Sequence, residues 1–243
     1  MKMLCFARRN VKEILRDPLN LCFGILFPLV LLFLLSAIQA NIPVKLFEIE
    51  RLAPGIGVFG LSFITLFSAT LISKDRGSSL FRRLYTTPLT PADFILGYTL
   101  PIIPLAMAQQ AICYISALAL GLDFSANLIF AIILSLPTSV LYISLGLLCG
   151  SLLNEKQVGS ICGALLTNLS AWLSGIWFDL ELVGKGFKDI AKSLPFYHSV
   201  QMQIAFVSGD FSGALPHMFL VIGYAVLFLA VAVTVFLRQM KKQ

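Results

Sequence analysis

Long runs without charged residues divide the chain. Each run contains no Asp, Glu, Lys or Arg, and the six are Leu19–Gln39, Leu52–Ser73, Phe94–Leu122, Leu128–Leu153, Val158–Phe178 and Met218–Leu237. An α-helix rises about 1.5 Å per residue, so roughly 20 residues cross a hydrocarbon core of about 30 Å. The runs are apolar on every side and do not alternate, unlike the strands of a membrane barrel. They predict an all-α membrane protein with six transmembrane helices.

The scarcity of charge supports this interpretation. Only 12% of the 243 residues are charged, whereas soluble domains carry about 25%. So few charges cannot cover a water-facing surface of this size, and the net charge of +6 comes from loops rather than from a nucleic-acid site. No polar stretch is long enough for a second folded unit. We therefore expect a single transmembrane domain over residues 1–243, surrounded by membrane lipid and binding no nucleic acid.

Lys and Arg are distributed unevenly between the two ends of the predicted helices. The N-terminal segment, the loops after the second and fourth runs, and the C-terminus together hold 13 of them, against 5 on the opposite side. Loops rich in Lys and Arg stay in the cytoplasm. We expect a multi-pass protein of the plasma membrane with both termini cytoplasmic.

Two polar segments predict short helices at the membrane surface. In residues 1–17, Arg8, Arg9, Lys12 and Arg16 lie opposite an apolar stripe that consists of Met3, Leu4, Ala7, Val11, Ile14 and Leu15. A basic amphipathic helix of this kind lies on anionic headgroups. Residues 179–216, between the last two runs, contain two further apolar stripes too weak to cross. They predict short interfacial helices in an extracellular segment.

The loop over residues 74–93 has the most informative pattern. Leu80 with Leu84, and Phe81 with Tyr85, are i,i+4 pairs on a predicted short helix, which must end before Pro88. Thr90 and Asp93 resemble a capping box at the start of the next helix. An interfacial helix that meets lipid is the alternative to a helix that contacts another protein.

This loop resembles the first cytoplasmic loop of ABC-2 type permeases, the membrane subunits of ATP-binding-cassette exporters. The similarity includes the acid, arginine and glycine cluster, the turn Thr87-Pro88-Leu89 and Gly97 in the following run. It extends to the N-terminal helix, the six runs and the turn Leu194-Pro195. The resemblance implies that a coupling helix contacts a separate ATPase through Arg76, Gly77, Leu80, Phe81, Arg82, Arg83 and Leu84.

The same resemblance implies that two permease copies, identical or related, act with two ATPase subunits. The chain itself has no phosphate-binding G-x-x-x-x-G-K-[ST] motif, because its Gly184-Lys185 pair lacks the earlier glycine. We expect no enzymatic activity, cofactor or metal site. His217 stands at the edge of a run, with no acid or second buried histidine predicted beside it, so no catalytic residue is expected.

Uncharged polar residues in the second and fifth runs are the candidates for a transport pathway. The resemblance implies that these runs lie near a cavity, and the candidates are Ser62, Thr65, Ser68, Thr167, Asn168 and Ser170. Hydrogen bonding between helices is the alternative role, above all for Asn168. Two small-residue pairs, Gly146 with Gly150 and Gly159 with Gly163, predict close helix packing.

These features predict a permease subunit of an ABC exporter. Its charge-free, Phe-rich runs suit an amphiphilic or hydrophobic substrate such as a drug, lipid or peptide, although polysaccharide remains open. An ATP-independent channel or carrier is the alternative function. The absence of charge within the runs argues against proton or sodium coupling.

Overall fold

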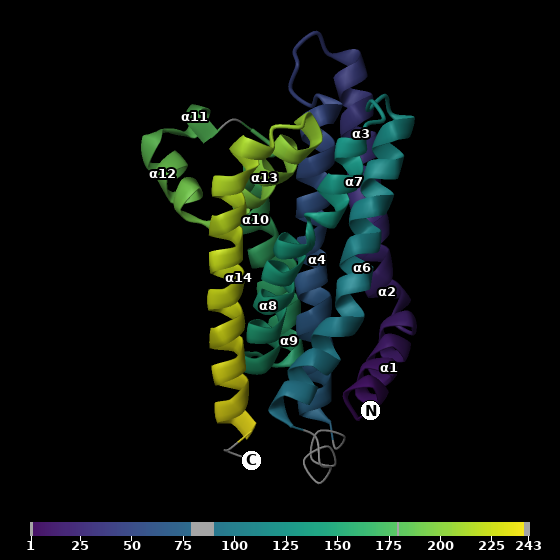
Figure 1. Cartoon of the computed structure of the whole chain (residues 1–243), viewed down its shortest axis with the longest axis vertical. Helices are drawn as coiled ribbons and strands as arrows, with labels where there is room; N and C mark the ends of the chain where they lie inside the picture. The colour runs from purple at the N-terminus through teal and green to yellow at the C-terminus, as the bar shows by residue number, and fades with distance from the viewer. Residues whose placement is uncertain (1, 79–89, 179, 241–243) are drawn as a thin grey trace.

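The computed structural model describes residues 2–78, 90–178 and 180–240. Their long helices lie lengthwise, and both termini are found at one end of the bundle (Figure 1). The short helices α11, α12 and α13 lie toward the opposite end. Within the described residues the regular elements are all helices, as the apolar runs predict.

Five helical segments among the described residues are long and apolar enough to cross a membrane: Pro18–Asn41, Ile49–Gly77, Ala92–Ala119, Ala126–Leu152 and Phe211–Gln239. The first comprises α2 (Pro18–Leu21), a π-helical turn at Cys22–Leu26 and α3 (Phe27–Asn41); the others are α4 (Ile49–Gly77), α6 (Pro91–Ala119), α7 (Ala126–Ile133) with α8 (Leu136–Leu152), and α14 (Phe211–Met240). These segments match five of the six predicted runs.

The sixth predicted run, Val158–Phe178, is not among those five segments. It is helical in three consecutive pieces, α9 (Glu155–Ser160), a π-helical stretch at Ile161–Leu166 and α10 (Thr167–Ser174). The helix ends at Gly175, whose φ of 74° lies in the left-handed region. Helical structure therefore stops before the predicted end of the run, and its passage through the bilayer remains a prediction.

Helix α4 occupies the centre of the bundle and packs against α8, α6, α13 and α3. In its most apolar window, 89% of the residues are buried. Close contact with α8 depends on glycine, because a Cβ at Gly146 would lie 2.7 Å from the Thr65 carbonyl oxygen. A Cβ at Gly159 would meet nothing within 4 Å. The predicted pair Gly146 and Gly150 therefore allows α8 to pack closely against α4, whereas Gly159 packs against no described helix.

Helix α1 (Lys2–Leu15) forms within the segment predicted to be an amphipathic helix. Its buried side chains are Phe6, Ala7, Asn10 and Ile14, and its partner is α6. Phe6 makes edge-on ring contacts with Phe94 and Tyr98 of α6. The predicted stripe divides between two sides: Ala7 and Ile14 are buried with Phe6 and Asn10, whereas Leu4, Val11 and Leu15 are exposed, and the place of α1 at the membrane surface stays a prediction.

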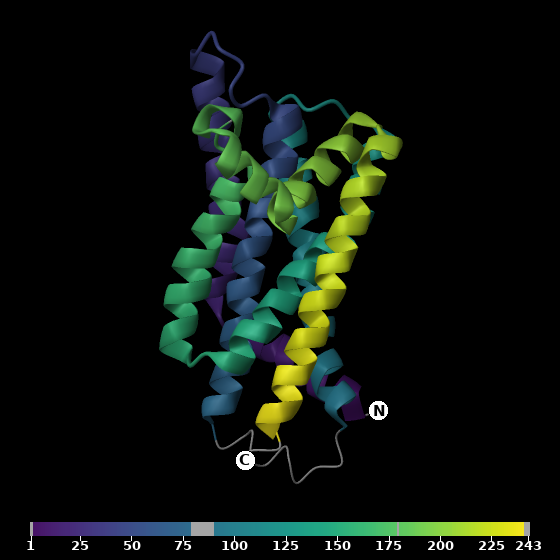
Figure 2. The same cartoon turned by 90° about the vertical axis from the view of Figure 1, so that its left-hand side faces the viewer.

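Three short helices follow α10: α11 (Leu180–Val183), α12 (Lys185–Ser193) and α13 (Pro195–Ser208). Figure 2 shows α13 between α10 and α14, and α13 also packs against α4. At 14 residues α13 is too short to cross a bilayer, yet one face of it is buried. A turn at Gly209, with a φ of 80°, leads into α14. That helix begins at Phe211, seven residues before the predicted run.

Candidate functional site

A cavity of about 590 Å³ opens at the end of the bundle opposite the termini. Its walls come from residues 45–47 and the first turn of α4, from residues 175–178 and 180–182 after α10, and from α12 and α13. Pockets for small molecules usually measure about 300–1,000 Å³. Size and accessibility therefore make this cavity the candidate ligand site, which we call the outer pocket.

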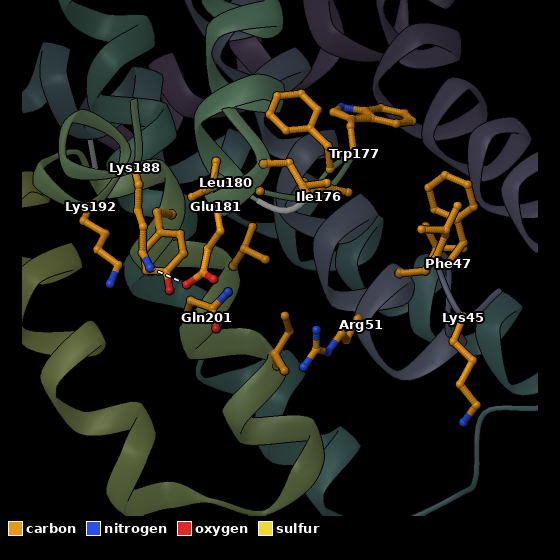
Figure 3. Close-up of a pocket in the computed structure, with 18 residues that line it drawn as sticks. Lys45, Phe47, Arg51, Ile176, Trp177, Leu180, Glu181, Lys188, Lys192 and Gln201 are labelled. Carbon is orange, nitrogen blue, oxygen red and sulfur yellow. Dashed lines mark hydrogen bonds and ion pairs between the residues drawn. The ribbon is translucent and has the colours of Figure 1, made fainter. Parts of the chain in front are cut away.

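Aromatic and aliphatic side chains form one wall of the outer pocket. Figure 3 shows Trp177 and Ile176 on this wall. The Trp177 ring packs edge-on against Phe59 of α4, with 5.9 Å between ring centroids. Val200 and Ile204 of α13 also line the cavity. A ligand here would meet an apolar surface held by packing against the central helix.

Basic side chains line the remainder of the outer pocket: Arg51, Lys188 and Lys192 lie inside it and Lys45 lies at its rim, against a single described carboxylate, Glu181. Lys188 forms an ion pair with Glu181. Gln201 lies beside this pair, and Arg51 lies farther along the cavity (Figure 3). Among the described residues, Arg51 and Lys192 make no ion pair. The cavity is therefore cationic, with two unpaired basic groups.

Lys45 differs from the other basic residues of the pocket. Its side chain is 82% exposed, forms a 2.8 Å ion pair with Glu48 and points away from the cavity (Figure 3). The hydrogen bond and the opposite charge raise the pKa of Lys45 and lower the pKa of Glu48. Lys45 lies on the rim and is a natural control for substitutions inside the pocket.

The three pathway candidates in α4 lie between helices of this chain and not in the outer pocket. Ser62 donates a hydrogen bond to the Phe59 carbonyl oxygen at 2.6 Å. Thr65 donates to the Tyr142 carbonyl oxygen of α8 at 2.7 Å, which joins the two helices. The Ser68 hydroxyl is buried and finds no hydrogen-bond partner among the residues that the structure describes. Thr65 and Ser68 therefore lie at the interface between α4 and α8, whereas Ser62 bonds within α4.

The candidates in the fifth run separate onto two faces. Thr167 and Ser170 are buried and donate hydrogen bonds to carbonyl oxygens of their own helical segment. Asn168 is exposed, and its amide nitrogen donates to the Ala164 carbonyl oxygen at 2.7 Å. Asn168 makes no hydrogen bond to another helix of the described chain. Its face is available to lipid or to a second copy.

Three buried glutamines escaped the sequence interpretation. Gln109 and Gln110 of α6 and Gln203 of α13 are fully buried, and Tyr114 donates to the Gln203 Oε1 atom at 3.0 Å. Gln109 donates a 3.3 Å hydrogen bond to the Gly57 carbonyl oxygen of α4. The criterion applied to Asn168, a carboxamide within an apolar run, would have identified Gln109 and Gln110.

A histidine pair near the outer pocket was also missed. The Nδ1 atoms of His198 and His217 lie 2.7 Å apart, and the His198 Nε2 atom lies 2.8 Å from the Lys192 carbonyl oxygen. A carbonyl only accepts, so the His198 Nε2 atom carries a hydrogen and donates it to Lys192, and a hydrogen shared between the two Nδ1 atoms joins the rings. The pair holds the end of α12 against α13 and α14. It joins residues 19 apart, which sequence spacing did not indicate.

At the opposite end of α4, one of the two described coupling candidates, Arg76, makes hydrogen bonds within the chain. One guanidinium nitrogen of Arg76 donates to the carbonyl oxygens of Gly150 at 2.7 Å, Ser151 and Leu153 at 3.4 Å, at the end of α8. Gly77 is the last residue of α4 and is exposed. The other coupling candidates lie outside the described residues: Leu80, Phe81, Arg82, Arg83 and Leu84.

Asp75 lies beside Arg76 and is buried. The two terminal nitrogens of Arg9 donate to its carboxylate at 2.5 and 2.8 Å, and the Tyr98 hydroxyl donates to it at 2.9 Å. Burial of the Arg9 guanidinium opposes its charge, but the hydrogen bond and charge of Asp75 outweigh burial and raise the Arg9 pKa. The expectation that Arg9 faces lipid headgroups was wrong, because it joins α1 to α4 and α6.

Comparison with known proteins gives a concordant result. The family model described as ABC-2 type transporter matches residues 2–207. A curated relative named "Putative transport permease ycf38", from Porphyra purpurea, is 32% identical over 141 residues. That match covers 54% of this chain and 48% of the relative, so the chain spans about half the length of the curated relative. Because the family match covers most of its length, the chain belongs to the ABC-2 type transporter family.

Proposed function

We propose that this chain is the permease subunit of an ABC exporter and that a separate ATP-binding-cassette ATPase drives it. Two permease copies, identical or related, form the translocation pathway for an amphiphilic or hydrophobic substrate. The chain crosses the plasma membrane six times, with the segment from Glu155 to Ser174 as the fifth crossing. Both termini and the loop after α4 face the cytoplasm, in agreement with the distribution of Lys and Arg.

The observation that carries this proposal is the attachment of α4 at its last turn. There Asp75 contacts α1 and α6 through Arg9 and Tyr98, and Arg76 contacts the end of α8. The loop at residues 79–89 follows directly. A force applied to that loop would therefore act on four helices together, because the buried contacts leave little slack between them. Such attachment suits a loop that transmits ATP-driven movement.

Within the loop, Leu80, Phe81 and Leu84 are the proposed anchors for the ATPase, with Arg82 and Arg83 beside them. Buried aromatic anchors surrounded by polar residues contribute most of the binding energy at many interfaces, and truncation of one costs about 2 kcal/mol or more. Asn168 and the other polar candidates of α4 and the fifth crossing are the proposed pathway residues. Asn168 is the one on an exposed face, where a second copy can complete the pathway.

Phe81→Ala tests the coupling role. In a pull-down with the tagged chain, the wild type should retain a protein that carries G-x-x-x-x-G-K-[ST] and hydrolyses ATP. Phe81→Ala should reduce this retention about 30-fold, which corresponds to the loss of about 2 kcal/mol. Phe124→Ala is the matched control, because Phe124 is exposed in the turn between α6 and α7.

The expression level of both variants should match that of the wild type, because both residues lie outside the helices proposed to cross the bilayer. Equal retention of the ATPase by Phe81→Ala and Phe124→Ala would contradict the coupling role. An ATP-independent carrier would retain no such ATPase in the wild type. The first result would refute Phe81 as the anchor for the ATPase, and the second would refute the exporter function itself.

A further inference from the structure

We propose that the outer pocket binds the acidic headgroup of an amphiphile, a phosphate or a carboxylate, while its apolar tail contacts the Trp177 wall. The assignment of this amphiphile as export substrate rests on the proposed function. The binding chemistry itself depends only on the pocket, whose charge and apolar surface are properties of the described residues.

Charge selects the headgroup. Within the described parts of the chain, Arg51 and Lys192 line the cavity without an ion pair, whereas Lys188 is partly neutralised by Glu181. Unpaired cations that line one cavity favour an anion and repel a cation. Arg51 can give two parallel N–H groups to a phosphate or carboxylate, which is the geometry that guanidinium groups provide best. Gln201 offers a further polar group beside the ion pair of Lys188 and Glu181 (Figure 3).

The Lys192 backbone is fixed by its surroundings. His198 donates a hydrogen bond to the Lys192 carbonyl oxygen, and the next carbonyl, that of Ser193, accepts one from the Tyr224 hydroxyl of α14. These contacts hold the end of α12 before any ligand enters. A site held in this way loses less conformational entropy on binding than a mobile segment would.

The apolar wall indicates that the ligand carries a tail. Ile176, Trp177, Val200 and Ile204 face the same cavity as the basic groups. Leu46 and Leu182 also line it and are largely exposed, which extends the apolar surface to the mouth. A free inorganic ion would use the basic side alone and leave this surface in water. An amphiphile covers both parts of the pocket.

Trp177 supplies a direct measurement. The chain has two tryptophans, and Trp172 is 51% exposed on α10, so Trp172→Phe leaves Trp177 as the sole tryptophan, which is excited selectively over the tyrosines. The protein in nanodiscs of uncharged lipid is titrated with 11-bromoundecyl phosphate, whose bromine quenches tryptophan. Neutral 11-bromoundecanol and cationic 11-bromoundecyl trimethylammonium are titrated in parallel. Quenching by the phosphate should saturate at a concentration at least tenfold lower than for the other two probes.

Substitutions locate the anion within the pocket. Arg51→Gln and Lys192→Gln should each weaken binding of the alkyl phosphate about tenfold, because each removes one charged donor. Lys45→Gln, the rim control, should leave binding unchanged. Glu181→Gln should tighten binding, because it removes the described carboxylate of the pocket, and this gain cannot arise from a folding defect.

Three outcomes would overturn the proposal. One is equal quenching by the phosphate and the alcohol, and another is equal affinity in the Arg51→Gln and Lys45→Gln variants. The third is displacement of the alkyl phosphate by inorganic phosphate at an equal concentration, which would show an ion site with no role for the tail. The assay contains no ATPase or ATP. Its failure leaves the exporter proposal standing, and a failure of ATP-driven transport leaves the binding result standing.

Discussion

The two ends of α4 each carry an arginine, but the surroundings of the two side chains differ. Arg76, in the last turn, donates hydrogen bonds to carbonyl oxygens at the end of α8. Arg51, in the first turn, lines an open cavity and makes no ion pair among the described residues. The hydrogen bonds that Arg76 makes within the chain indicate a structural role. The open cavity around Arg51 leaves its charge available to a ligand.

The neighbours of the two arginines extend this difference. Asp75 is enclosed by Arg9 and Tyr98, so the end of α4 near the termini is a closed polar network. At the other end the basic residues outnumber the described carboxylates of the outer pocket. One end of the central helix is therefore held rigidly against its neighbours, and the opposite end is open to a ligand of opposite charge.

The largest expected effect on folding comes from Asp75→Asn. The substitution removes the buried counter-charge of the partly buried Arg9 guanidinium and leaves it only the exposed Glu13. Breaking a buried ion pair costs about 3–5 kcal/mol, and partial exposure of Arg9 reduces this to about 2 kcal/mol. Thermal unfolding of the purified protein in detergent is the measurement. Glu13→Gln is the control, because Glu13 pairs with Arg9 on the exposed side of α1; equal shifts in the two variants would contradict a closed network.

The same substitution at the two ends of α4 sharpens the comparison. Arg76→Gln should lower the free energy of unfolding by about 1.5 kcal/mol, because several carbonyl groups lose a charged donor. Arg51→Gln should leave it unchanged, since Arg51 has no ion pair among the described residues to lose. Both variants are measured by thermal unfolding without added ligand. A larger loss in Arg51→Gln would reverse the assignment of the structural and the ligand-binding end.

A smaller effect is expected at the histidine pair. His217→Leu removes the hydrogen-bond partner of the His198 Nδ1 atom and should cost about 1 kcal/mol, the usual net value of one hydrogen bond. Because the pair holds α12 in place, hydrogen exchange of the α12 amides should also become faster. Leu215→Ala, an exposed change in the same turn of α14, is the control. Unchanged α12 exchange in His217→Leu would exclude a positioning role for the pair.

The sequence predicted the positions of the long helices better than the faces they bury. Apolar runs locate a helix in lipid, but lipid and protein interior are both apolar, so periodicity does not distinguish α4, which is mostly buried, from α14, which is mostly exposed. The amphipathic pattern of α1 failed for a related reason. Its polar residues Arg9 and Asn10 find partners inside the bundle, Asp75 and the Gly97 carbonyl oxygen.

The candidate site was not visible in the sequence. The resemblance placed Arg76 among the residues that contact an ATPase, which stays a prediction, and the hydrogen bonds of Arg76 to α8 depend on a contact across 74 residues. The outer pocket collects residues from four separate segments, and no local pattern joins Arg51 to Lys192. Gln109 and Gln110 are the exception, since their position in an apolar run was visible in the sequence.

ATP-dependent export in reconstituted vesicles tests the central claim most directly. Vesicles with the chain and its ATPase facing outward are given a fluorescent alkyl phosphate in the outer leaflet, and its accumulation in the lumenal leaflet is followed. The account predicts accumulation with ATP, and background rates without ATP, without the ATPase, or with an ATPase whose P-loop lysine is replaced. Transport at the full rate by the chain alone would contradict the account.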